Sequence, residues 1–159
     1  MSIVFEKRVC SRCSGDGHFT NYGHIYGGKC FKCHGAGSVL TKRGRTAWAT
    51  FKTALTIPAS ELEKGMGVYL MEHNPFTGGT REFKARVYSI EWNEKLEKFE
   101  IEFADMAWTH LIDAKFIGKA FNPSEKFRMT MNSKNRHLAV EALKGLKGAT
   151  ITETEEVIA

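Results

Sequence analysis

Two C-x-x-C pairs lie in the first quarter of the chain and constrain its fold more than any other feature. Cys10 and Cys13 form the first pair, Cys30 and Cys33 form the second, and sixteen residues separate Cys13 from Cys30. Each pair can present two thiolates from one tight turn, and this separation is typical of four-cysteine zinc sites. We therefore expect an N-terminal zinc ribbon in which the four cysteines hold one structural Zn²⁺.

Glycines recur at the same places after both cysteine pairs. The segments CSRCSGDG (10–17) and CFKCHGAG (30–37) both read C-x-x-C-x-G-x-G. A metal knuckle turns backbone N–H groups toward its thiolates, and this often requires a positive φ, which glycine adopts without steric cost. The repeat therefore predicts a knuckle at each pair, with positive φ at the glycines Gly15, Gly17, Gly35 and Gly37.

Three other interpretations of the cysteines compete with zinc. Disulfides need an oxidising compartment, but the N-terminus MSIVFEKRVC has no long apolar stretch of the kind found in a secretory signal. The chain also lacks the ~18 consecutive apolar residues of a membrane helix, so we expect a cytoplasmic protein. Thiol exchange ranks low because no βαβ pattern surrounds either pair, and an iron–sulfur cluster ranks behind zinc because the paired glycines favour a zinc knuckle.

Three histidines lie close to the cysteines in the sequence. With four thiols available, we expect His18, His24 and His34 to lie beside the metal site or on the surface rather than to bind the metal. His24 stands in the loop between the two pairs, and a role for it at the metal stays open.

Positive charge is concentrated in the cysteine-rich part of the chain. Residues 1–50 contain eight Lys or Arg against two Asp or Glu, whereas residues 51–159 contain fifteen against sixteen. Such a concentration of basic residues favours an anionic partner, although cations near thiolates can also neutralise the metal site. If the partner is nucleic acid, we expect phosphate contacts from Arg8, Arg12, Lys29, Lys32, Lys42, Arg43 and Arg45, and stacking on Tyr22, Tyr26 and Trp48.

The remaining chain has the pattern of short strands followed by one helix. Apolar and alternating segments at 67–71, 83–90 and 99–103, separated by turn residues, predict a small antiparallel β-sheet or barrel. Residues 132–147 carry apolar side chains at helical spacing, with Asn132 or Ser133 as a cap and Gly148 as a stop. The predicted fold class is therefore α+β and mostly β.

This pattern divides the chain into four expected parts. Residues 1–40 form the zinc ribbon, and 41–48 form a basic connector. Residues 49–124 form a small β-barrel-like domain, and 125–159 form the C-terminal helix and an acidic tail.

The repeated C-x-x-C-x-G-x-G of residues 10–37 resembles the zinc-finger repeats of DnaJ-type co-chaperones. Those proteins carry four repeats, whereas this chain has two and lacks the His-Pro-Asp motif of a J-domain, so the resemblance implies the zinc fold and not co-chaperone activity. The string GHIYGGKCFKCHGAG at 23–37 also resembles small zinc-finger proteins of bacteriophages and other mobile elements. Residues 59–68, 87–92 and 99–103 are weakly similar in pattern to Src-homology-3-like small barrels.

Two functions follow as expectations. The chain has no P-loop, G-x-S-x-G, H-E-x-x-H or dinucleotide fingerprint, so we expect a binding protein rather than an enzyme. The first expectation is an adaptor that binds nucleic acid with little sequence preference. The alternative is a protein-binding module that docks on a host polymerase, chaperone or defence factor, with Trp92 and Trp108 as anchors if they are exposed.

Overall fold

The computed structural model describes residues 2–73, 80–105 and 117–152, and its contacts group the chain into two compact units. The first unit combines Met1–Phe51 with Val140–Ala159, and the second comprises Lys52–Ala139. Each unit is described by itself below. Within the described ranges, no helix is both long enough and apolar enough to cross a membrane.

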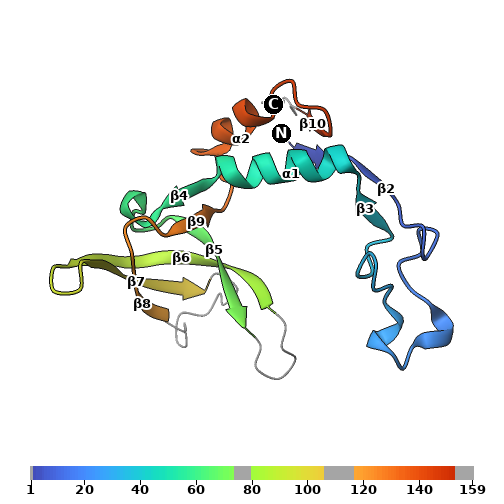
Figure 1. Cartoon of the computed structure of the whole chain (residues 1–159), viewed down its shortest axis with the longest axis horizontal. Coiled ribbons are helices and arrows are strands. Elements are labelled where there is room, and N and C mark those ends of the chain that lie inside the picture. Colours follow the sequence, from blue (N-terminus) through green and yellow to red (C-terminus); the bar gives the residue numbers. More distant parts are fainter. Residues whose placement is uncertain (1, 74–79, 106–116, 153–159) are drawn as a thin grey trace, which may run out of the picture. The chain divides into compact units, whose positions relative to one another are not determined.

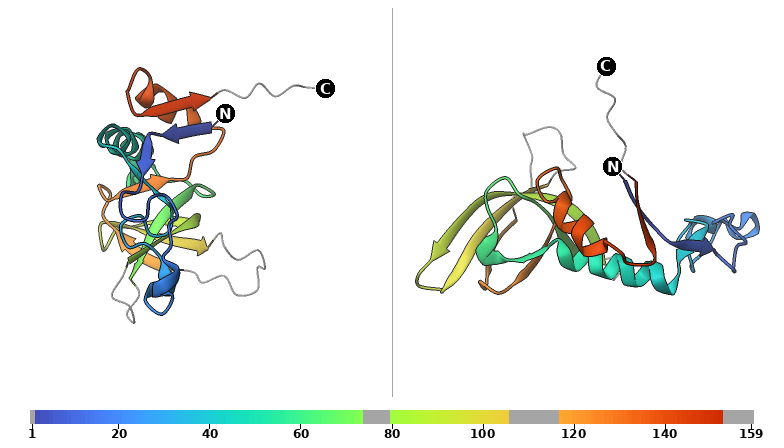
Figure 2. Two further views of the ribbon diagram at one scale, coloured as in Figure 1. Left: turned by 90° about the vertical axis from the view of Figure 1, so that its right-hand side faces the viewer. Right: turned by 90° about the horizontal axis from the view of Figure 1, so that it is seen from above.

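The first unit contains two short antiparallel strand pairs. Strand β1 (Ser2–Phe5) pairs with β10 (Ala149–Thr152), so that segments near the two ends of the chain lie side by side (Figure 2). Strand β2 (Lys7–Val9) pairs with β3 (Ser38–Leu40), and the cysteine-rich segment connects them. That segment contains two 3-10 turns, η1 (Thr20–Tyr22) and η2 (Tyr26–Gly28).

Helix α1 (Lys42–Ala54) follows β3 directly. The hydroxyl of Thr41 accepts a hydrogen bond from the N–H of Gly44 at 3.0 Å, which caps the start of the helix. Trp48 and Phe51, one helical turn apart, pack on each other and on Phe5, with ring centroids 5.0 to 5.5 Å apart. This half-buried aromatic cluster packs one side of α1 against β1.

The helix occupies most of the range 41–48, which the sequence pattern suggested as a connector. Its three cations Lys42, Arg43 and Arg45 are exposed, whereas Gly44 and Ala47 are buried. The cations therefore lie on the solvent-exposed side of the helix. Its apolar side is completed by Phe5, which comes from a distant segment of the chain.

The second unit is built on one antiparallel sheet (Figure 1). Its strands are β4 (Thr56–Pro58), β5 (Gly67–His73), β6 (Thr80–Asn93), β7 (Lys98–Asp105), β8 (Ile117–Phe121) and β9 (Lys126–Met129). They are arranged in the order β4-β9-β5-β6-β7-β8, with β4 and β8 as edges. The sheet is therefore open, and of the two predicted forms, sheet or barrel, the chain adopts the sheet.

Alternation along the strands creates the core of this unit. Val68 on β5, Ala85 and Val87 on β6, and Ile101 and Phe103 on β7 are buried on one face of the sheet. Leu62 and Ala59 reach this face from the segment around the 3-10 turn η3 (Ala59–Glu61). The three strand segments predicted at 67–71, 83–90 and 99–103 are confirmed within β5, β6 and β7.

The C-terminal region differs from its expected form. Strand β9 extends the sheet beyond residue 124, and β10 at 149–152 forms a strand where a helix and tail were expected. The predicted helix at 132–147 is present as α2 (Arg136–Leu143), which is shorter than the pattern suggested.

Local hydrogen bonding explains the shorter helix. The side-chain oxygen of Asn132, the expected helix cap, accepts hydrogen bonds from the N–H groups of Lys134 and Asn135, ahead of the first residue of α2. Those bonds stabilise a turn that precedes α2. The helix then stops before Gly145, which has a φ of 74°, and not at Gly148.

Candidate metal centre

The strand pair β2–β3 flanks the two knuckles in the sequence. The first knuckle begins at Cys10, directly after β2, and the second knuckle ends at Gly37, directly before β3. All four glycines of the repeat have positive φ, at 105° and 76° in the first knuckle and 88° and 68° in the second. The prediction that these glycines supply left-handed backbone is confirmed.

The four thiols converge on one point. Their sulfur atoms all lie within 4.8 Å of one another, and all four cysteines are buried. The Sγ atoms of Cys10 and Cys30 are 3.9 Å apart, and those of Cys13 and Cys33 are 3.7 Å apart. A tetrahedral zinc site with Zn–S bonds of about 2.3 Å requires sulfur atoms about 3.8 Å apart. The donor set therefore fits a single metal ion such as zinc.

Backbone hydrogen bonds join the knuckles in a reciprocal pattern. The N–H of Cys10 donates to the carbonyl of Gly37 at 2.9 Å, and the N–H of Cys30 donates to the carbonyl of Gly17 at 2.8 Å. The residues in these two bonds are related by a shift of twenty positions, the same shift that relates the sequence repeats. Each knuckle is thus held by the last glycine of the other.

Two of the four glycines are required for a second reason. A Cβ on Gly17 would overlap the carbonyl of Gly35, and a Cβ on Gly37 would overlap the carbonyl of Gly15. By contrast, a Cβ on Gly15 or Gly35 would come no closer than 3.5 Å to a side chain. The last glycine of each knuckle therefore permits the close approach of the two loops that brings the thiols together.

Two of the thiols, those of Cys10 and Cys33, have pKa values shifted from that of an isolated cysteine. Burial disfavours the Cys10 thiolate, but the N–H groups of Cys13 and Arg12 and the neighbouring thiols favour it, and the pKa of Cys10 falls from 9.0 to about 6. Burial and the neighbouring Cys13 and Cys30 raise the pKa of Cys33 from 9.0 to about 11. Four crowded thiols cannot all ionise unless a cation offsets the repulsion, and a divalent metal is that cation. The N–H of Gly17 also donates to the sulfur of Cys13 at 3.2 Å.

The neighbouring histidines lie outside this group of thiols. His18, His24 and His34 are all exposed, whereas the cysteines are buried. His18 takes part in an isolated bridge with Lys29, and His34 has a φ of 51°, the second-knuckle counterpart of Ser14. Within the described residues, only the four cysteines gather closely enough to hold a metal.

The seven cations predicted to contact phosphate are all exposed. The guanidinium of Arg12 lies 3.5 Å above the ring of Phe31, which is itself 62% exposed, and Lys32 donates to the Ser11 hydroxyl at 2.6 Å. Arg43 forms an ion pair with Glu6 at 3.2 Å. The structure therefore leaves these side chains at the surface, with Arg12 and Phe31 together on the outer side of the knuckles.

Among the aromatic residues predicted to stack on nucleic-acid bases, the structure describes only the side chain of Trp48. Trp48 is half-buried and uses its ring in contacts with Phe5 and Phe51, so it serves the core of the first unit. Tyr22 and Tyr26 lie in η1 and η2, and their side chains are outside the described part of the structure. Phe31 is instead the exposed ring, and it lies beside the guanidinium of Arg12.

The start of α1 is a feature that the sequence interpretation missed. Lys42, Arg43 and Arg45 occupy its first turn, which contains no acidic residue. Thr41 directly before the basic run was the available signal, since threonine is a preferred N-cap residue.

Comparison of the chain with protein-family models, with curated proteins and with solved structures finds no match.

Proposed function

We propose that the first unit is a zinc-stabilised module that binds nucleic acid through its phosphate backbone with little sequence preference. One observation carries this proposal, namely that helix α1 begins with three exposed cations and no acid. The N-terminal end of a helix is already positive, because its first N–H groups lack partners within the helix. Adding Lys42 and Arg45 there is unfavourable for the isolated protein, whereas the charge of Arg43 is offset in part by its ion pair with Glu6.

An anionic partner removes this electrostatic penalty. Phosphate groups are attracted both to the helix start and to the cationic side chains, and their binding releases counterions from the nucleic acid. Lysine and arginine contacts to phosphate position a protein without reading bases. Weak sequence preference therefore follows from the type of contact.

The metal and the compartment belong to the same proposal. Zinc is the metal that best matches four buried thiols in knuckles with positive-φ glycines. A reducing compartment such as the cytoplasm keeps those thiols available for the metal. Binding of this kind requires no catalytic group, and it is compatible with the resemblance of residues 23–37 to zinc-finger proteins of bacteriophages.

A charge-reversal experiment tests the proposal. Fluorescence anisotropy with labelled DNA and RNA should show binding that weakens steeply with salt, and the triple change Lys42→Glu, Arg43→Glu and Arg45→Glu should nearly abolish it. Each lost phosphate contact lowers the slope of log K against log salt by about 0.9. The matched control reverses three exposed lysines of the second unit, Lys84, Lys95 and Lys134, and should retain binding despite the same change in net charge.

Two results would contradict this proposal. Wild-type protein that binds no nucleic acid at physiological salt would exclude it, and so would equal losses in the α1 variant and the control. Zinc content measured on every variant separates loss of contact from loss of the fold.

A second candidate function rests on the β6–β7 hairpin. Trp92 is 47% exposed beside Phe99, and Leu96 in the turn is 52% exposed. Exposed aromatic residues of this kind serve as anchors in protein interfaces. Trp108, the other anchor expected from sequence, lies outside the described residues. Recovery of one partner after nuclease treatment, lost on Trp92→Ala and kept on Lys95→Ala, would support a protein-binding role.

A further inference from the structure

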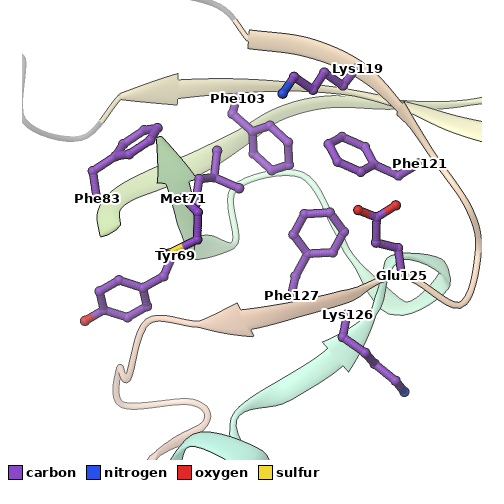
Figure 3. A pocket seen from close by; sticks show the side chains of 10 residues that line it. Tyr69, Met71, Phe83, Phe103, Lys119, Phe121, Glu125, Lys126 and Phe127 are labelled. Carbon is purple, nitrogen blue, oxygen red and sulfur yellow. The ribbon is translucent and has the colours of Figure 1, made fainter. Parts of the chain in front are cut away.

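A cavity of about 420 Å³ opens in the second unit where strand β9 separates from β5. Pairing between these strands is limited to Val68↔Met129 and Tyr69↔Arg128, and the other edge of β9 pairs with β4 over Lys126–Arg128. The space left beside β5 is lined by residues of five strands (Figure 3). Its volume lies in the range of ~300–1,000 Å³ that is common for small-molecule sites.

Aromatic rings form the wall of this cavity. Phe103 on β7, Phe121 on β8 and Phe127 on β9 contact one another, with centroids 5.0 to 5.9 Å apart. Phe121 comes from the edge strand β8, so the curved sheet brings two strands that do not pair onto one aromatic cluster. Phe83 and Tyr69 complete the lining on the other side (Figure 3).

Two charged side chains flank the rings. Lys119 lies two residues before Phe121 on β8 and therefore shares its face of the sheet, and Glu125 lies in the turn before β9. Both are exposed, and Figure 3 shows the ring of Phe121 between them. Lys126 also borders the cavity, but it alternates with Phe127 and extends away from the rings.

We propose that this cavity binds a nucleotide, with the base against Phe121 and the phosphate at Lys119. A planar heteroaromatic ring can pack edge-to-face or offset against Phe121, as single-stranded nucleic acids do on aromatic side chains, while the buried rings of Phe103 and Phe127 support Phe121 from behind. The carboxylate of Glu125 can accept hydrogen bonds from amino groups at the edge of a base, and the ammonium of Lys119 supplies the charge for a phosphate.

The placement of the charges favours a nucleotide over other ligands. A free aromatic amino acid carries its ammonium and carboxylate on one carbon, whereas Lys119 and Glu125 lie on opposite sides of Phe121. A fatty acid would make no use of Glu125, because it has no hydrogen-bond donor at the end opposite its carboxylate. A nucleotide carries its anionic group and the hydrogen-bonding edge of its base at different ends, as the two charged side chains are placed.

The same chemistry can come from a free nucleotide or from one unit of a single strand, and the experiment distinguishes them. Zinc-loaded full-length protein is titrated with nucleoside monophosphates, short single-stranded oligonucleotides, inorganic phosphate and phenylalanine, and amide resonances are followed by NMR. We expect saturable shifts at residues 119–127 and at Phe83 and Phe103. Competition between monophosphates and oligonucleotides indicates a unit of a strand, whereas shifts with monophosphates alone indicate a free nucleotide.

Three variants test the assigned residues. Lys119→Glu should weaken binding about tenfold through loss of a charged contact, and Phe121→Leu should weaken it about tenfold through loss of stacking. Glu125→Gln should reduce the preference for AMP and CMP, which have exocyclic amino groups, over UMP. Lys95→Glu, in the β6–β7 turn, is the matched control and should change nothing.

Absence of saturable shifts at 119–127 would overturn the proposal, as would equal affinity for phenylalanine or binding unaffected by Lys119→Glu. The α1 triple variant should retain these shifts, because the cavity is made entirely of residues in the second unit. Failure of nucleic-acid binding at α1 and failure of nucleotide binding at the cavity are therefore separate results.

Discussion

At the scale of single residues, the glycines of the knuckles do more than adopt positive φ. Gly15 and Gly35 have space for a side chain, with nearest side-chain atoms at 3.5 Å, so only their backbone conformation favours glycine. Gly17 and Gly37 also face a carbonyl of the opposite knuckle at a distance that excludes any Cβ. Sequence repeats that look identical therefore contain positions with different physical requirements.

Gly37→Ala should destabilise the zinc-loaded protein more than Gly27→Ala. Both positions have a φ between 60° and 70°, which costs an alanine about 1–2 kcal/mol. A Cβ on Gly27 meets no atom within 4 Å, whereas one on Gly37 overlaps the carbonyl of Gly15. At Gly37 this overlap should add about 1–3 kcal/mol to the loss of stability. Thermal unfolding measures the difference in stability between the two variants. Equal decreases in melting temperature would mean that the two knuckles can move apart at Gly37 with no loss of stability.

The thiols predict one zinc ion per chain. Sulfur–sulfur distances of 3.7 and 3.9 Å match a tetrahedral site, and the raised pKa of Cys33 means that a metal must displace its proton on binding. Elemental analysis of purified protein should give one zinc and no iron. Iron in place of zinc, or a metal-free protein with two disulfides, would contradict this assignment.

At the scale of secondary-structure elements, α1 combines two roles in one segment. Its first turn carries the exposed cations, and its apolar side packs Trp48 and Phe51 on Phe5. Gly44 lies between these regions, and a Cβ there would overlap the carbonyl oxygen of Glu6. A glycine inside a helix costs about 1 kcal/mol relative to alanine, so the contact with the segment around Glu6 explains its presence.

Gly44→Ala should lower the melting temperature even though alanine is the better helix former. The gain in helix propensity of about 1 kcal/mol is smaller than the cost of moving α1 away from Glu6, whose carbonyl also accepts a hydrogen bond from the N–H of Thr41. Thr46→Ala, at an exposed position of the same helix, is the control and should leave stability unchanged or slightly raised. A higher melting temperature for Gly44→Ala would show that the contact is easily relaxed.

At the scale of the whole molecule, the first unit is discontinuous in sequence. Strand β1 pairs with β10 from Ser2↔Thr152 to Phe5↔Ala149, and the N–H of Glu6 donates to the carbonyl of Gly148 at 2.8 Å. The second unit lies between these segments in the chain and has its own core of strand residues. The strand pairing of the first unit and the hydrophobic core of the second unit are therefore each formed by residues of one unit alone.

Cys13→Ser should unfold the knuckles and leave the sheet of the second unit intact. The buried residues around the thiols are the cysteines themselves, with Phe19 and Val39 packed against them, so little apolar core remains without the metal. Hydrogen exchange should show lost protection at 10–37 and retained protection in β5, β6 and β7. Equal loss of protection along the chain would mean that the two units unfold cooperatively.

Several features were predictable from sequence because local patterns specify them. Fixed cysteine and glycine spacing predicted the knuckles, and alternation predicted the strands within β5, β6 and β7. The extent of α2 and the helical state of residues 42–54 were less accessible. The apolar side of α1 packs on Phe5 from a distant segment, so its helical pattern is incomplete without that partner. The turn before α2 depends on hydrogen bonds of the Asn132 side chain, which apolar periodicity does not reveal.

The sequence by itself determined that four thiols would converge and that the fold would be mostly β, because ligand spacing and side-chain alternation are properties of short segments. Only the tertiary structure decided that β10 pairs with β1 and that β9 lies between β4 and β5. The same is true of the aromatic cavity, where Phe121 meets Phe103 and Phe127. Pairing between distant strands depends on the curvature of the sheet and on loop closure, and neither is encoded in any single segment.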